Sequence, residues 1–332
     1  MKLAVTDSPA PFVGTETSLI VRLLPGLTCL IYPVLVWSIS AWSPYMLPLT
    51  MIPPIVSMAC IFRMSPQNRY PRAVAVAHLG VAAPALYNLI GAVLDFQEGI
   101  PFHGNAAWIV LWIGLLTLVA FEKPAPASSG HVHSQSRLKT AHGIAAAVVV
   151  LFALFHLTNH LAGLAGGEAH LALMKAFRTV YRSAIIEPLL GTAVVFQVLS
   201  GFVLLRRRLM TPDRFEMVQG AAGAYLLVFF VPHLRAVLRA RYVRHIDTNW
   251  IWLTSSNLLT DEWSARLVPY YFLGILALGV HGACGLRYVL RQHGRDTAAT
   301  AAFWTFSVAS VVVALAIMTG LIAGSMHQPP AI

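Results

Sequence analysis

The sequence contains few charged residues and few cysteines. Only 11 % of its 332 residues are Asp, Glu, Lys or Arg, whereas a water-soluble domain has about 25 %. The three cysteines, Cys29, Cys60 and Cys284, lie far apart and form no CxxC pair, which argues against an iron–sulfur cluster and a disulfide framework. The chain also has no Rossmann glycine fingerprint, no flavin site and no HExxH motif. These absences exclude a complete soluble dehydrogenase and a typical zinc enzyme.

Apolar residues dominate instead, at 57 % of the chain, with a mean hydropathy of +0.69. A membrane-spanning helix needs about 20 mostly apolar residues. About nine ranges approach this criterion, namely 19–42, 45–62, 72–94, 105–121, 139–164, 184–205, 218–239, 267–290 and 299–324. The first eighteen residues lack the apolar core of a cleavable signal, so we expect the first range to remain as a helix. The sequence predicts an all-α integral membrane protein with about nine transmembrane helices.

The net charge of +10 is a topology signal in such a chain. Lys and Arg residues cluster in short segments between the apolar ranges, where they contact lipid headgroups, so we expect no nucleic-acid partner. Assigning the segments to alternate sides places 15 of the 23 Lys and Arg residues on the side of the amino terminus and 8 on the other. The positive-inside rule then predicts a cytoplasmic amino terminus in a cell inner membrane.

One segment interrupts the apolar pattern. Residues 123–137, "KPAPASSGHVHSQSR", are rich in Pro, Ser and Gly, as expected of a solvated linker. The linker divides the chain into a four-helix region, 1–122, of unknown role and a five-helix region, 138–332. His131 and His133 form an HxH pair in the linker, but a solvated loop is the simpler interpretation.

Histidines recur at defined depths in the five-helix region. The run "LFALFHLTNHLAGL" at 151–164 places His156 and His160 among apolar residues. At a rise of about 1.5 Å per residue, His156 and His233 lie about 25 and 24 Å along their helices and share one level near the outer surface. Gln197 and His281 share a second, inner level. Ionisable side chains in hydrocarbon face the bundle interior, and haem b takes two axial histidines from facing helices. Hydrogen bonds between helices are the alternative role for these histidines.

Three motifs strengthen the haem interpretation. In chain order they are His142 followed by "HLTN" at 156–159, "QGAAGAYLLVFFVPH" at 219–233 and "HGACGL" at 281–286. With this order and spacing, residues 134–324 resemble the five-helix cytochrome b membrane anchor of succinate dehydrogenase and fumarate reductase, of the single-chain type that holds two haems. The resemblance implies that the first and third helices ligate one haem, here through His156 and His233. It implies that the second and fourth helices ligate the other.

The second of the five helices departs from that family. It has "FQVLSG", which places Gln197 at the ligand position, and glutamine is not an expected axial ligand. Three arrangements of the inner site therefore stay open: the site is empty, is five-coordinate through His281, or is rebuilt around His142.

Further polar residues surround the outer level. His160 lies one turn beyond His156 and is either an alternative ligand, a hydrogen-bond donor to a haem propionate or quinone, or a packing residue. Residues 165–183 predict an amphipathic helix at the outer interface, where Glu168, Arg178 and Arg182 are candidate contacts for quinone or propionate. The alternative is an ordinary interfacial helix whose cationic side chains extend toward the headgroups. In the resembling family this side can carry quinol oxidation.

The resemblance implies a haem b subunit that passes electrons between the quinone pool and a soluble redox partner. We expect the partner on the cytoplasmic loops, for which "RRRLMTPDR" is a candidate docking segment. The sequence predicts no catalytic residue, so the chain is at most a quinone-reactive subunit of an oxidoreductase complex. The alternative is a haem-free polytopic membrane protein, either a transporter or an assembly scaffold.

Overall fold

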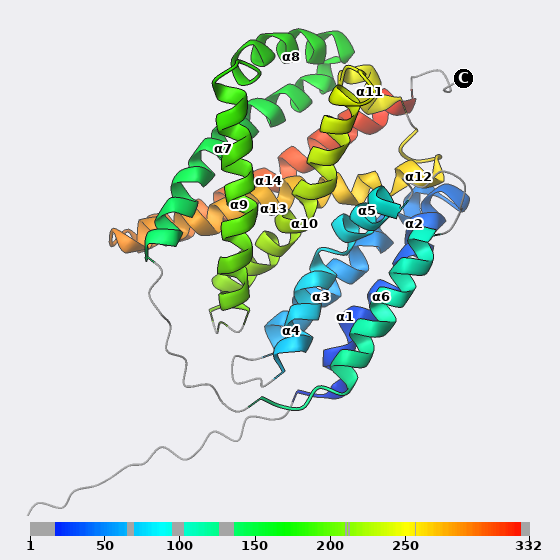
Figure 1. The fold of residues 1–332 in the computed structure, drawn as a ribbon, viewed down its shortest axis with the longest axis vertical. Helices are drawn as coiled ribbons and strands as arrows, with labels where there is room; N and C mark the ends of the chain where they lie inside the picture. The colour runs from blue at the N-terminus through cyan, green and yellow to red at the C-terminus, as the bar shows by residue number, and fades with distance from the viewer. Residues whose placement is uncertain are drawn as a thin grey trace, which may run out of the picture.

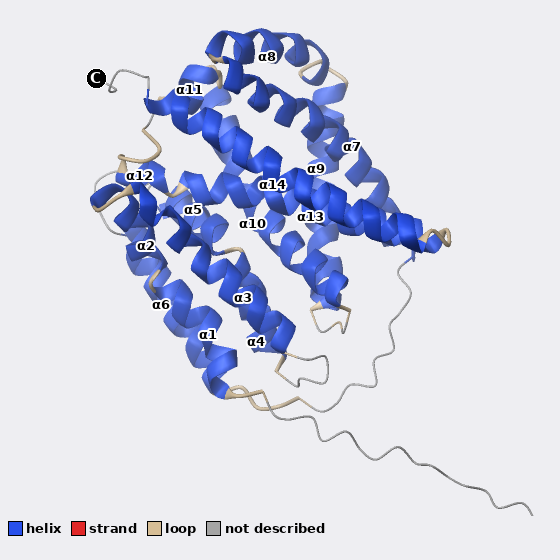
Figure 2. Ribbon diagram, turned by 180° about the vertical axis from the view of Figure 1, so that it is seen from behind, coloured by secondary structure: helices blue, strands red, loops and turns tan. Residues whose placement is uncertain are grey.

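Apolar runs separated by short polar segments produce a helical fold, because a helix satisfies its own backbone hydrogen bonds in hydrocarbon. The computed structural model describes residues 17–64, 70–94, 103–125, 136–209, 211, 213–255 and 257–326. These residues form helices and loops and contain no strand (Figure 2). Most of the predicted linker, including His131 and His133, lies outside the described residues.

The amino-terminal region consists of short helical pieces. They are α1 (Leu19–Leu30), α2 (Tyr32–Ala41), the 3-10 helix η1 (Pro44–Met51), α3 (Ile52–Arg63), α4 (Pro71–Val81), α5 (Ala83–Leu94) and α6 (His103–Ala120). Helices α4 and α5 meet at an angle of 76°. The bend follows from Pro84, whose ring would clash with the backbone of a continuous helix and which cannot donate a backbone hydrogen bond.

Five long helices form the rest of the structure, together with shorter helices at their ends. The elements are α7 (Ser136–Ala162), η2 (Gly163–Ala165), α8 (Gly167–Tyr181), α9 (Ile186–Arg208), α10 (Arg214–Tyr242), α11 (Trp250–Thr254), α12 (Glu262–Ala265), α13 (Leu267–Gln292) and α14 (Asp296–Met326). Helix α8 lies across one end of the bundle, beside α11 (Figure 1). We call this the α8 end, and the opposite end, where α7 begins, the linker end. The amphipathic helix predicted at 165–183 is thereby confirmed as α8.

Seven helical segments within the described residues are long and apolar enough to cross a membrane. They are 19–41, 44–63, 137–165, 186–206, 214–242, 263–292 and 296–326. The count reaches eight if the bent α4–α5 pair forms one span, and the apolar part of α6, Gly104–Ala120, is shorter. These segments indicate a multi-pass membrane protein, but the prediction of nine spans is not confirmed. The difference has two causes. A hydropathy count does not register the bend at Pro84, and the range 105–121 was counted although it is shorter than the roughly 20 residues that span a membrane.

The two regions share a buried core. Ala82 and Ala85, at the α4–α5 bend, pack against Tyr225 of α10 and Ala277 of α13. Small residues allow such helices to approach closely, as is usual in membrane proteins. The linker therefore marks a change in composition but not a break between two separate cores. The amino-terminal helices cover α10 and α13 on one side.

Candidate functional site

Four histidines come together near the α8 end of the bundle. His156 and His160 lie on α7, His170 on α8 and His233 on α10, and we call them the histidine cluster. The ring centroids of His156 and His233 are 6.0 Å apart. His160 connects the two parts of the cluster, since its ring centroid lies 4.6 Å from that of His156 and 5.6 Å from that of His170. The structure thus brings together the two residues that the sequence places at equal depth.

Phenyl rings orient both members of the His156–His233 pair. Phe152 stacks on His156 at 5.5 Å with an interplanar angle of 17°, and Phe229 stacks on His233 at 5.1 Å and 18°. Each phenylalanine lies one helical turn before its histidine, and residues four apart share one face of a helix. Helix α7 packs chiefly on α9, α8 and α14, whereas α10 packs on α13, α9 and α5. The two imidazoles therefore meet across the bundle interior.

The spacing of this pair allows a test for an iron ligand set. An imidazole nitrogen binds a metal at about 2 Å and the ring centre lies about 1 Å behind it, so two imidazoles on opposite sides of one iron have centres about 6 Å apart. The His156–His233 separation of 6.0 Å fits this arrangement. Within the described ranges, no three His, Cys, Asp or Glu side chains converge as a zinc ion would require. The separation of the two rings is therefore compatible with two imidazole ligands of one metal ion.

Unpaired polar atoms adjoin the pair on its α8 side. The side-chain amide nitrogen of Asn159 lies 3.1 Å from Nε2 of His170. Oδ1 of Asn159, Nδ1 of His160 and Nδ1 of His170 are buried and have no hydrogen-bond partner in the protein. A buried polar atom without a partner costs about 1–3 kcal/mol, and such atoms are few in native proteins. This part of the cluster is suited to a ligand that both donates and accepts hydrogen bonds.

His170 is the least exposed member of the cluster, and the sequence offers it, with Glu168 and the arginines of the amphipathic helix, as a proton acceptor or propionate contact. Its side chain is 1 % exposed and its ring centroid lies 5.0 Å from that of Trp250. Burial, reinforced by the positive charge of Arg178, lowers the pKa of His170 to about 4. His170 is therefore neutral at physiological pH, with one ring nitrogen as a donor and the other as an acceptor.

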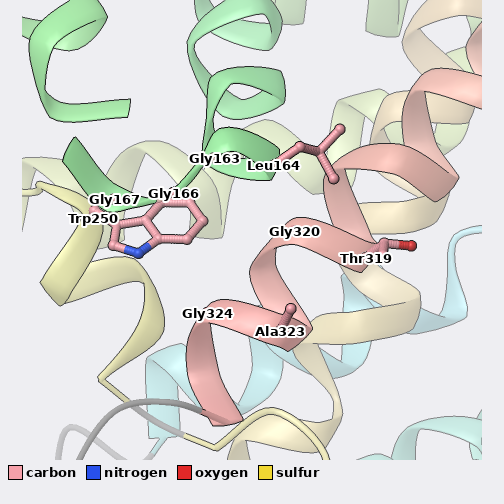
Figure 3. A pocket seen from close by; sticks show the side chains of 9 residues that line it. All are labelled: Gly163, Leu164, Gly166, Gly167, Trp250, Thr319, Gly320, Ala323 and Gly324. Carbon is pink, nitrogen blue, oxygen red and sulfur yellow. The ribbon is translucent and has the colours of Figure 1, made fainter. Parts of the chain in front are cut away.

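Trp250 closes the cluster toward the α8 end. A Cβ atom built at Gly163, Gly167 or Gly324 would overlap its indole ring, so these glycines make room for it. A cavity of about 430 Å³ lies beside the ring, between η2, the start of α8 and the last turns of α14 (Figure 3).

The candidate quinone or propionate contacts of α8 have different environments. Glu168 is exposed. Arg178 forms an ion pair of 2.6 Å with Asp247 and donates to the backbone carbonyl of Thr248 at 3.1 Å, so it fastens α8 to the loop before α11. Arg182 is half-buried, and burial together with the charge of Arg178 lowers its pKa. Arg178 therefore has a structural role that its position in the sequence did not indicate.

A second pair of imidazoles lies toward the linker end. His142 of α7 and His281 of α13, which we call the histidine pair, have ring centroids 6.4 Å apart. Gln197 does not lie opposite His281 as a ligand, because its side-chain amide donates to the backbone carbonyl of His142 at 2.6 Å. The three arrangements of an inner haem site that the sequence left open stay predictions.

His78 of the amino-terminal region is buried outside both sites. Its Nδ1 donates to the carbonyl of Val74 at 2.9 Å, and its ring packs beside Gly220 of α10. This is the packing role expected of an isolated intramembrane histidine.

The chain was compared with models of protein families, with curated proteins and with solved structures. None of the three comparisons finds a match.

Proposed function

We propose that this chain is a membrane-embedded b-type cytochrome that passes electrons between quinone and a soluble redox partner. The spacing of His156 and His233 carries the proposal, since 6.0 Å between ring centroids is the separation expected for two axial ligands of one iron. The resemblance to the succinate dehydrogenase and fumarate reductase anchor points to the same function.

In this proposal haem b is held between α7 and α10. His156 and His233 would ligate the iron from α7 and α10, with Phe152 and Phe229 stacked behind them. Haem iron supplies one-electron chemistry at a potential set by its ligands and their surroundings. The apolar helix faces would surround the macrocycle and keep water from it.

The unpaired polar atoms beside this pair suit a quinone headgroup. His160 and His170 offer imidazole nitrogens and Asn159 offers an amide oxygen, all buried and without partners in the protein. A quinone accepts hydrogen bonds through its two carbonyl oxygens, and the quinol donates through its hydroxyls. Reduction of the quinone takes up two electrons and two protons, and oxidation of the quinol releases them. In this proposal haem held by His156 and His233 would supply the one-electron chemistry, and ring nitrogens of His160 and His170 would give up or take up the protons of the quinone headgroup.

The soluble partner would dock at the linker end. Arg206 and Arg214, on either side of the loop between α9 and α10, are exposed there and offer positive charge. This end is cytoplasmic if the amino terminus is, as the distribution of Lys and Arg predicts for a protein of the inner membrane.

A difference spectrum tests the proposal. The detergent-purified protein, expressed with a haem supply, is expected to show a b-type band when its reduced spectrum is compared with its oxidised spectrum. His156→Ala and His233→Ala should each remove one haem per chain, whereas His293→Ala, at the exposed end of α13, should remove none. The absence of a b-type band, or a band unaffected by both cluster substitutions, would reject the proposal in favour of a haem-free membrane protein.

The quinone part of the proposal needs its own measurement. Added quinol should reduce the haem of the purified protein, and His170→Gln should slow that reduction about tenfold without changing the spectrum, because one hydrogen-bonding ring at the headgroup is lost. An unchanged reduction rate would remove His170 from the quinone site.

A further inference from the structure

We infer that the cavity beside Trp250 binds the isoprenoid chain of the quinone whose headgroup meets the histidine cluster. The inference rests on the quinone part of the proposed function and deepens it. It assigns the hydrocarbon chain a site of its own, and it makes the substrate a quinone that carries such a chain.

The walls of the cavity are small and apolar. Most of the residues that line it are glycines, and Leu164 and Ala323 add aliphatic side chains. Among the lining residues that the structure describes, the hydroxyl of Thr319 and the indole N–H of Trp250 are the only polar side-chain groups. A ligand that fills this space is itself apolar, because a buried polar group would leave its hydrogen bonds unmade.

The cavity has an exposed rim and a buried floor. Leu164, Thr319 and Ala323 are exposed at the rim, whereas Gly163 and Trp250 are buried (Figure 3). Thr319 and Ala323 belong to the last turns of α14, a helix that is long and apolar enough to span a membrane. The rim therefore opens to the hydrocarbon of the bilayer, and a chain enters it without crossing water.

Trp250 joins the cavity to the histidine cluster. Its indole lines the cavity, and its ring centroid lies 5.0 Å from that of His170, whose side chain is 1 % exposed. Nδ1 of His170 is buried and has no hydrogen-bond partner among the described residues. A polar site and an apolar space thus adjoin the same indole ring. An isoprenoid quinone has the same two parts, a polar headgroup and an apolar chain.

Hydrogen bonding determines which nitrogen of His170 meets the headgroup. The side-chain amide nitrogen of Asn159 is a donor, so Nε2 of His170, 3.1 Å away, accepts from it. A neutral His170 then carries its proton on Nδ1, which donates to a quinone carbonyl oxygen. Oδ1 of Asn159 accepts from a quinol hydroxyl. Because Nδ1 belongs to the ring that contacts Trp250, a headgroup held there lies next to the wall of the cavity.

The volume of the cavity suits about three isoprene units. An apolar cavity of about 150 Å³ binds benzene. The cavity beside Trp250, at about 430 Å³, has room for about three such groups, or roughly 17 carbon atoms. Three isoprene units contain about 15 carbon atoms and would fill it. The rest of a longer chain would extend through the open rim into the lipid.

Photolabelling of the full-length, detergent-purified protein tests the inference. The probes are a benzoquinone and a naphthoquinone, each with a chain of three isoprene units that ends in a diazirine. At least one probe should label residues 163–167 or 319–324, as mapped by mass spectrometry of the digested protein. About a tenfold excess of the same quinone without the diazirine should reduce this labelling about tenfold, whereas the same excess of phosphatidylcholine should not. Labelling of neither segment by either probe would overturn the inference. Equal competition by phosphatidylcholine would also overturn it, because the cavity would then be a general site for lipid chains.

Substitutions that fill the cavity provide a second measurement. Ala323→Phe and Thr319→Phe each add a phenyl group to the lining from an exposed position of α14, so we expect both variants to fold. Each should reduce the labelling about tenfold, because the phenyl group occupies the space of the chain. Gly191→Phe is the matched control, since its position on α9 is exposed and a Cβ atom there has no heavy atom within 4 Å. Its labelling should equal that of wild type, and labelling that persists in both cavity variants would overturn the inference.

The labelling requires neither haem nor electron transfer, so its failure is distinguishable from that of the proposed function. A wild type that shows the b-type band but no label at the cavity would overturn this inference alone. A wild type that is labelled at the cavity but binds no haem would overturn the proposed cytochrome and leave the site for the quinone chain standing.

Discussion

Burial of His170 should make the stability of this protein depend on pH in a defined window. The pKa of His170 is lowered to about 4 in the folded protein, while an unfolded histidine titrates near about 6.5. Between these values the unfolded chain binds more protons than the folded one, so the free energy of unfolding falls as the pH falls. The groups that face His170 are Asn159, His160 and Trp250, together with the charge of Arg178.

The size of the effect follows from the two pKa values. They differ by about 2.5, and each pH unit between them is worth about 1.36 kcal/mol, so the whole contribution of about 3 kcal/mol is lost below pH 4. From pH 7.5 to pH 5.5 the His170 contribution should fall by about 1.3 kcal/mol.

The assay is reversible unfolding in mixed micelles titrated with sodium dodecyl sulfate at the two pH values. His170→Gln keeps an amide next to Asn159 but does not titrate, so its loss of unfolding free energy between pH 7.5 and 5.5 should be smaller than that of wild type by about 1.3 kcal/mol. His293→Gln, at an exposed position, corrects for the change in histidine count. An equal loss in wild type and His170→Gln would refute the reasoning.

Three further substitutions test contacts that position the helices. Glu122→Ala should lower the free energy of unfolding by about 1–2 kcal/mol, since the carboxylate accepts from the backbone N–H of Arg72 at 2.7 Å and caps α4; no loss would mean that water replaces the cap. Trp250→Ala should cost about 3–5 kcal/mol in the same assay, and a smaller cost would show that the glycine-lined corner collapses around the gap. Glu187→Gln should cost less than about 1 kcal/mol, because Glu187 and Arg241 are 36 % and 31 % exposed, and a double-mutant cycle with a coupling above that value would contradict the expectation.

Some features of the fold could be predicted from the chain alone because they depend on local chemistry. Apolar runs longer than about 20 residues specify spanning helices, and the amphipathic pattern around Met174 specified α8. The equal depth of His156 and His233 followed from counting residues at a constant rise. The bend at Pro84 shows the limit of such counting. The hydropathy of a segment does not reveal whether its helix runs straight or changes direction, as it does between α4 and α5.

The candidate site could not be predicted from residue spacing along one helix, because it depends on how each helix is rotated and which helices it packs against. Glu168 and His170 are two residues apart on α8, yet only His170 turns into the bundle, because the packing of α8 on α7 and Trp250 sets its rotation. The departure at Gln197 was visible in the sequence, but its consequence was not. That consequence depends on how α9 lies against α7, where the amide reaches a backbone carbonyl.

The amino-acid sequence by itself determined that this is a helical membrane protein with histidines at fixed heights, because hydrophobicity and helical rise are properties of a single segment. Only the tertiary structure decided which histidines face each other. Pairing depends on the rotation and neighbours of each helix, and these are set by side-chain packing between segments far apart in the chain. For that reason the His142–His281 pair emerged only when α7 and α13 were placed around the same interior.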